Sequence, residues 1–367
     1  MLQPSAPQKR SNGRYAPFLL LLLLVGLIIA YALYWRSASA RFQLEVDRAI
    51  ADLSDQSIAL DFSDRKVGGF PFQLKTTLTA VRVAQAGAGL SWRARFPELV
   101  IVAQPWNASL VLYGGGTPEI EGEIDWPTRA ETRRYPFTLA ADGLRASFRR
   151  GNAGDQFSTQ NAFQLNAVNL NAPKIFGKDV PLLAEKLALY LRFPPTGGGE
   201  SGGLDAPIQA QLSLSAGNFG LAGSEGNQAP ATRIDEANLA LTLRGETRPR
   251  RTVSELIRWN EGGGTLDLDA ATVSQDGKEA VLKGTFALDE RLRPLGALDG
   301  KVTDVEWFQG LWQNISGADS STSWRSEVTD RNVRSDGKTV ASLSFQLQNG
   351  ALLLGDTELF SVAPIAR

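Results

Sequence analysis

The feature that most constrains the fold is an alternation of apolar and polar residues that returns along most of the chain. In V-G-G-F-P-F-Q-L-K-T-T-L, residues 67–78, the side chains of Phe70, Phe72 and Leu74 share one parity, and Gln73 and Lys75 share the other. Successive side chains of a β-strand point to opposite sides, so this spacing predicts a strand with one apolar and one solvated face. The same spacing recurs over residues 90–96, 119–126, 144–149, 208–215, 238–244, 266–269 and 341–348.

Turn signals separate these segments. They are Gly114-Gly115-Gly116, Asp276-Gly277, Asp336-Gly337 and Asn349-Gly350. Many short amphipathic strands joined by tight turns predict a mainly β protein with an antiparallel sheet. A capping box at residues 252–255 and an apolar stripe over 305–315 add a few helices to this prediction.

An uncharged segment, residues 15–35, precedes the predicted strands. Roughly 20 apolar residues form a helix of about 30 Å, which is enough to cross the hydrocarbon core of a bilayer. The tail over residues 1–14 carries Lys9, Arg10 and Arg14 and no acidic residue, which predicts a cytoplasmic N-terminus. The rest of the chain then lies across the membrane, which in a bacterium is the periplasm.

A cleaved signal peptide is the alternative, because Ala38-Ser39-Ala40 fits a small-x-small cleavage site. The apolar run is longer than the roughly 7–15 residues of a signal-peptide core, which favours a retained anchor. Both alternatives export the same domain.

The exported part divides by its composition. An amphipathic juxtamembrane helix is predicted over residues 36–60 and a first β-rich half over 61–193. A glycine-rich loop over 194–206 then leads to a second β-rich half over 207–367.

The residue types that are missing exclude several kinds of chemistry. The chain has 38 basic and 39 acidic residues, which argues against a nucleic-acid partner, and it has neither histidine nor cysteine. Disulfides, thiolate nucleophiles, Ser-His relays and His/Cys zinc sites are therefore excluded. We expect no cofactor, no metal and no enzyme activity, although a two-carboxylate hydrolase needs no histidine and stays open as a third possibility. We interpret the acidic residues over 119–125 as a solvated face that pairs with Arg133 and Arg134.

Three segments carry a resemblance to a known family. They are G-F-P-F-Q-L-K-T-T-L-T at residues 69–79, S-W-R-A-R-F-P-E-L-V-I-V-A-Q-P-W-N at 91–107 and L-S-F-Q-L-Q-N-G-A-L-L-L-G-D-T-E-L at 343–359. The chain resembles an uncharacterised family of bacterial envelope proteins, the domain of unknown function 2125, and is remotely similar to AsmA-like envelope proteins. The second resemblance implies a long sheet curled into a trough with an apolar inner face, and a link to envelope lipid homeostasis.

The alternation and this resemblance together lead to a functional hypothesis. We expect a single-pass inner-membrane protein whose periplasmic domain holds acyl chains of membrane lipid in an apolar groove, with other envelope proteins as further partners. Two β-sandwich-like halves with closed cores, acting as a non-catalytic scaffold or assembly factor, are the alternative. The residues predicted to line the groove are Phe70, Phe72, Leu74, Trp92, Phe96, Leu212, Leu214, Leu241 and Phe345.

Overall fold

The computed structural model describes most of the chain. The described residues are 16–87, 89–127, 132–151, 155, 157–172, 181–195, 206–221, 233–246, 253–316, 324–328, 330–333 and 339–361. The predicted cytoplasmic tail, most of the glycine-rich loop and the Asp336-Gly337 turn lie outside them.

Helices are few, as the sequence predicts. They are α1 (Ala16–Asp55), α3 (Val253–Glu261), α4 (Val305–Ser316) and the 3-10 helix η1 (Trp324–Glu327). The strands of the first part are β1 (Ile58–Asp61), β2 (Asp64–Gly68), β3 (Leu74–Gln85), β4 (Leu90–Gln104), β5 (Asn107–Gly115), β6 (Glu119–Pro127), β7 (Thr132–Ala140), β8 (Gly143–Arg150), β9 (Thr159–Asn171) and β10 (Leu182–Phe193). The strands of the second part are β11 (Ile208–Leu221), β12 (Ile234–Arg244), β13 (Thr265–Gln275), β14 (Lys278–Leu288), β15 (Pro294–Val302), β16 (Asp330–Val333), β17 (Thr339–Gln348), β18 (Ala351–Leu354) and β19 (Thr357–Ser361).

All of these strands belong to one antiparallel sheet of 19 strands. β3 pairs with β1 and β2 on one side and with β4 on the other. β4 and β9 are bridged by two shorter pairs, β5–β8 and β6–β7. From β9 the strands follow in chain order to β15, and β15 pairs with β17. β10 pairs directly with β11, so the sheet is continuous across the glycine-rich loop, and the alternative of two sandwich-like halves is not what the structure contains.

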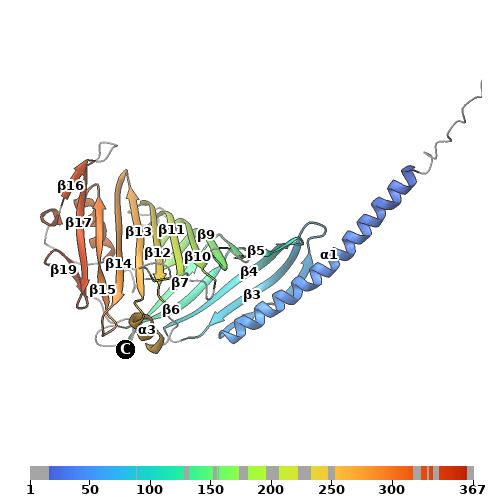
Figure 1. Ribbon diagram of the computed structural model, residues 1–367, viewed down its shortest axis with the longest axis horizontal. Coiled ribbons are helices and arrows are strands. Elements are labelled where there is room, and N and C mark those ends of the chain that lie inside the picture. Colours follow the sequence, from blue (N-terminus) through green and yellow to red (C-terminus); the bar gives the residue numbers. More distant parts are fainter. Residues whose placement is uncertain are drawn as a thin grey trace, which may run out of the picture.

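The sheet curls as it proceeds, so that β3–β5 and β14–β19 stand at opposite ends of a bent surface (Figure 1). Several long strands change parity part-way, which adds to this curl. In β3 the inward residues are Leu74, Thr76 and Leu78 before Ala80, which has a φ of 51°, and Val81 after it. An extra or left-handed residue in a strand produces such a switch and increases the local twist.

The predicted anchor and the predicted juxtamembrane helix form one unbroken helix. α1 runs from Ala16 to Asp55, and β1 starts at Ile58, inside the range 36–60 that the sequence assigned to a helix. α1 is long and apolar enough to span a membrane, and the apolar part is not buried by any described part of the protein.

Two helices and two turns confirm the predictions made from local sequence. α3 and α4 occupy the two ranges with helical patterns. Asp276-Gly277 joins β13 to β14 and Asn349-Gly350 joins β17 to β18. All four turn residues have positive φ, between 50° and 77°, as a two-residue hairpin requires.

The strand predicted over residues 67–78 begins later than its pattern indicates. Residues 69–73 form a loop between β2 and β3, with a cis peptide bond between Phe70 and Pro71, and β3 starts at Leu74. Phe70 and Phe72 therefore lie outside the sheet, at the end that approaches α1.

Candidate functional site

The apolar face of the sheet forms rows of facing side chains that cross nearly the whole molecule. One row takes a residue from each of twelve strands, and each member is the cross-strand partner of the next. At about 4.8 Å per strand, the row is about 50 Å long, which exceeds the hydrocarbon thickness of a bilayer, about 30 Å. Its members are Thr76, Ile101, Tyr113, Ala146, Phe163, Leu189, Leu214, Leu239, Ala271, Leu282, Gly300 and Leu343.

Helix α1 covers the first end of this face. Phe42 and Val46 of α1 pack on Leu74, Leu78 and their neighbours in β3 and β4, and all four of these residues are buried. The polar member of the row at this end is satisfied, because the Gln43 amide donates to the Thr76 hydroxyl at 2.8 Å. This end is a filled core.

An ionic contact outside that core also holds α1. Arg65 of β2 forms a salt bridge with Asp47 and donates a hydrogen bond to the side chain of Gln43. A charged hydrogen bond beside an apolar contact fixes the rotation of the helix as well as its position. Burial raises the pKa of the nearby Tyr113 phenol, so this group stays neutral within the same cluster.

Helix α4 and η1 cover the other end. Phe308 of α4 and Trp324 of η1 pack on Leu343 and Phe345, with the Trp324 and Phe345 rings 6.0 Å apart. Leu343 is only 1% exposed. This end is filled as well.

Between the two covered ends the face is open among the described residues. Phe163 is 40% exposed, and the following row members, Leu189, Leu214 and Leu239, are half-buried. None of them belongs to any of the four clusters of buried side chains in the described part of the chain. We call this region the open window, defined by Phe163, Leu189, Leu191, Leu212, Leu214, Leu239 and Leu241.

The window contains one polar group that lacks a partner. Asn161 lies between Phe148 and Leu191 in the adjacent row, and its side-chain oxygen is buried without a hydrogen-bond partner in the described structure. An unpaired buried acceptor costs about 1–3 kcal/mol, so this side chain weakens the folded sheet locally.

The structure separates the nine residues that the sequence assigned to a groove. Leu212, Leu214 and Leu241 lie together in the window. Trp92 and Phe96 lie on the same face near α1, where the Trp92 indole donates to Gln85 at 2.9 Å and Phe96 packs against the α1 cluster. The remaining four lie elsewhere: Leu74 and Phe345 are buried beneath helices, and Phe70 and Phe72 are in the loop before β3.

Four window residues were not among the predicted groove residues, namely Phe163, Leu189, Leu191 and Leu239. Leu239 lies in a segment whose alternation was recognised, whereas the alternation of β9 and β10 was missed because it changes parity there. In β9, Phe163 and Leu165 share one parity and Val168 and Leu170 the other, with Ala167 at a φ of 46° between them. Reading each half of these strands separately would have found the signal.

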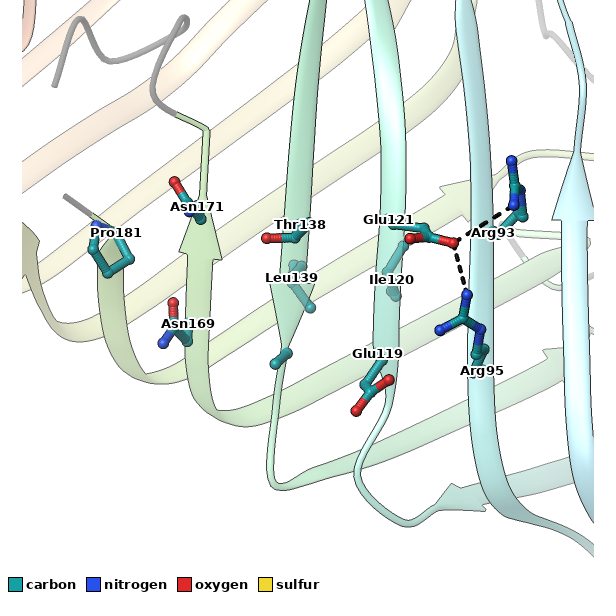
Figure 2. A pocket seen from close by; sticks show the side chains of 11 residues that line it. Arg93, Arg95, Glu119, Ile120, Glu121, Thr138, Leu139, Asn169, Asn171 and Pro181 are labelled. Atoms are coloured by element: carbon teal, nitrogen blue, oxygen red, sulfur yellow. Dashed lines mark hydrogen bonds and ion pairs between the residues drawn. The ribbon is translucent and has the colours of Figure 1, made fainter. Parts of the chain in front are cut away.

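The opposite face of the sheet is polar, and a shallow cavity of about 440 Å³ lies on it. Figure 2 shows Arg93 and Arg95 of β4 reaching the same carboxylate, that of Glu121 on β6, at 3.7 and 2.9 Å. Thr138 and Asn169 line the cavity from β7 and β9. Arg134 pairs with Glu123 and Asp125, as the sequence indicated, whereas the Arg133 side chain lies outside the described residues.

A second polar cavity of about 920 Å³ lies over β12–β15. Two of its carboxylates are engaged with neighbours: Asp267 accepts from Arg244 at 2.6 Å and from Thr285 at 2.9 Å. Asp269 accepts from the buried Thr242 hydroxyl at 2.7 Å. No cluster of three acidic residues in the described part of the chain could hold a metal ion.

Comparison with known proteins places the chain in a family. The profile of a family described as an uncharacterized protein conserved in bacteria (DUF2125) matches residues 35–363. The chain belongs to this family. The match begins at the last residue of the predicted membrane span, so the DUF2125 region comprises the docked half of α1 and all 19 strands of the sheet. No curated protein and no solved structure matches the chain significantly.

Proposed function

We propose that this DUF2125 protein is a single-pass inner-membrane protein whose periplasmic sheet shelters lipid acyl chains in the open window, and so contributes to lipid homeostasis of the envelope. The observation that carries this proposal is the row of cross-strand neighbours, apolar apart from Thr76 and Gly300, which is buried at both ends by helices and half-exposed in the middle. A soluble domain that needed only a core would have no reason to leave its central leucines uncovered.

The anchor supports the same function. Residues 16–35 of α1 continue without a break into the segment that packs on β3. A bilayer-spanning helix that is part of the domain keeps the window close to its source of lipid. The basic tail before the span supports a cytoplasmic N-terminus and a periplasmic sheet.

Recognition in the window would be by shape and hydrophobicity. The window offers apolar side chains from β9 to β12. Burying the tail of a lipid there removes apolar surface of both partners from water, at roughly 25 cal/mol per Å². No cofactor and no catalytic group is part of this proposal.

Photo-cross-linking in the full-length protein tests the proposal. The protein is reconstituted with phospholipid that carries a diazirine in its acyl chain, irradiated, and the labelled peptides are identified by mass spectrometry. We expect labelling of β9–β12 peptides in addition to the span of α1. Absence of labelling in β9–β12, whatever the labelling of the membrane-embedded segments, would refute the proposal and favour a scaffold.

A matched pair of variants sharpens this test. Leu214→Asp places a charge in the window and should reduce labelling of β9–β12 by at least about tenfold, because burying an unpaired carboxylate costs several kcal/mol. Leu295→Asp changes a residue that is 45% exposed on the opposite face and should leave labelling unchanged. Equal labelling of both variants would contradict a role for the window.

A further inference from the structure

Two loops at one end of the sheet are bound to the end of the membrane-spanning segment. The Tyr31 hydroxyl donates to the carbonyl of Pro71 at 2.6 Å, and the Trp35 indole donates to the carbonyl of Gln73 at 3.0 Å. The Tyr34 hydroxyl donates to the carbonyl of Pro105 at 2.8 Å. The β2–β3 loop and the β4–β5 turn therefore sit beside one helical turn of α1.

The sequence of α1 indicates the depth of these contacts relative to the bilayer. Arg36 is the first charged residue after the apolar run. Tyr31 precedes it by about one and a half turns, which is about 7 Å along the helix axis. Tyrosine and tryptophan near the end of a span sit at the boundary between headgroups and hydrocarbon. The two loops bonded to them are consequently at the same depth.

These loops expose large aromatic side chains. Phe70 is 55% exposed even though its ring packs edge-on against Trp35 at 5.4 Å. Phe72 is 69% exposed and Trp106 is 60% exposed. They are the most exposed aromatic side chains outside α1 among the described residues, and all three lie in the two loops that touch the span.

We propose that Phe70, Phe72 and Trp106 insert into the periplasmic leaflet of the membrane that α1 crosses. The partner is the bilayer interface, where the Trp106 indole can keep its N–H among the headgroups while the two phenyl rings enter the hydrocarbon. This inference rests on the anchoring in the proposed function and adds a second membrane contact, made by the sheet itself. Figure 1 shows β3 and β5 beside α1, and with α1 and both loops embedded the starts of these strands would lie at the membrane surface.

Site-directed spin labelling of the full-length protein in liposomes tests this contact. The chain has no cysteine, so single cysteines can be introduced without removing native ones. Phe72→Cys and Trp106→Cys report on the loops. Leu22→Cys, in the span and 72% exposed, provides the bilayer reference, and Leu295→Cys provides the aqueous reference.

The frequency with which each spin label collides with oxygen and with a water-soluble nickel chelate distinguishes a lipid environment, an aqueous environment and burial in a protein contact. We expect labels at 72 and 106 to resemble the label at 22, with access to oxygen and at least about fivefold less access to the chelate than the label at 295. Free access to the chelate would overturn the proposal. Restricted access to both reagents would overturn it in favour of a protein partner.

This result is independent of the cross-linking experiment. A protein with aqueous loops could still hold lipid in the window, and a protein with inserted loops could leave the window empty. Because the substituted side chains are exposed, circular dichroism of the variants should match that of the unmodified protein, which controls for misfolding.

Discussion

At the scale of single residues, the ends of the apolar face depend on a few polar contacts that hold the covering helices. Asp304 lies directly before α4, accepts a hydrogen bond from the backbone of Trp307 at 2.9 Å and pairs with Lys278 at 2.8 Å. The Lys278 side chain, followed by the backbone of Trp307, lowers the pKa of the Asp304 carboxyl. Asp304 is thus both the N-cap of α4 and its ionic link to β14.

Asp304→Ala should destabilise the protein by about 1 kcal/mol at neutral pH, because the cap and the ion pair are both lost. A carboxyl whose folded-state pKa is lowered contributes stability above its unfolded pKa of about 3.9, and that contribution disappears as the pH falls through the folded pKa. The difference in melting temperature between the two proteins should therefore shrink below about pH 4. Thermal melts across pH 3–7 measure it.

Asp304→Asn is the matched control for the cap. Asparagine caps a helix about as well as aspartate, so this variant should retain most of the stability lost in Asp304→Ala. Equal losses in the two variants would show that the Lys278 pair, and not the cap, stabilises α4.

At the scale of elements, α1 combines a segment long and apolar enough to span a membrane with a segment that is part of the core. Its second half lies along β3, and its faces differ sharply: Phe42 is 7% exposed against the sheet, whereas Leu44 is 55% exposed. The same helix thus offers a buried and an exposed apolar residue two positions apart.

Phe42→Ala should cost about 3 kcal/mol, because it removes a large side chain from a filled core. Leu44→Ala should change stability by less than about 0.5 kcal/mol, because Leu44 touches little of the fold. Limited proteolysis after residue 36 and thermal melts report both effects. Similar losses in the two variants would mean that α1 is not docked on β3 as described.

Local sequence pattern was sufficient for α3, α4, the two hairpin turns and strands with an unbroken alternation, such as β6, β8 and β17, because each is encoded within a few residues. It did not find β9 and β10, whose alternation changes parity, and it placed the start of β1 inside a helix. It could not show which apolar strand face a helix covers. Leu74 and Leu212 occupy the same kind of alternating pattern, yet α1 buries the first and nothing described covers the second. Whether a helix covers a strand face depends on contacts between residues far apart in the chain, such as Phe42 with Leu78. The spacing of apolar residues within one segment does not reveal such contacts.

At the scale of the whole molecule, the contacts of α1 bear on whether the span is retained. Cleavage after Ala40 would remove Tyr31, Tyr34 and Trp35, which bond to the loops beside β3 and β5. Ser39, in the middle of the possible cleavage site, is buried within the docked helix. These contacts support a retained anchor.

We therefore expect a C-terminally tagged protein to fractionate with membranes at the mass of the full chain, 39.6 kDa without the tag. Ala40→Leu, which blocks processing at a small-x-small site, should leave that mass unchanged. Immunoblots of the membrane and soluble fractions distinguish a retained anchor from a cleaved signal peptide. A shorter soluble product that lengthens in the variant would demonstrate a cleaved signal peptide.

The docking of α1 along β3 also sets how the sheet can move relative to the proposed anchor. The helix continues from Arg36 to Asp55, a distance of about 28 Å at 1.5 Å per residue, and this half packs on the sheet, so no flexible linker separates the span from the sheet. If the window holds lipid as proposed, the sheet cannot carry that lipid to a distant acceptor on a flexible tether. A recipient would then have to approach the anchored protein.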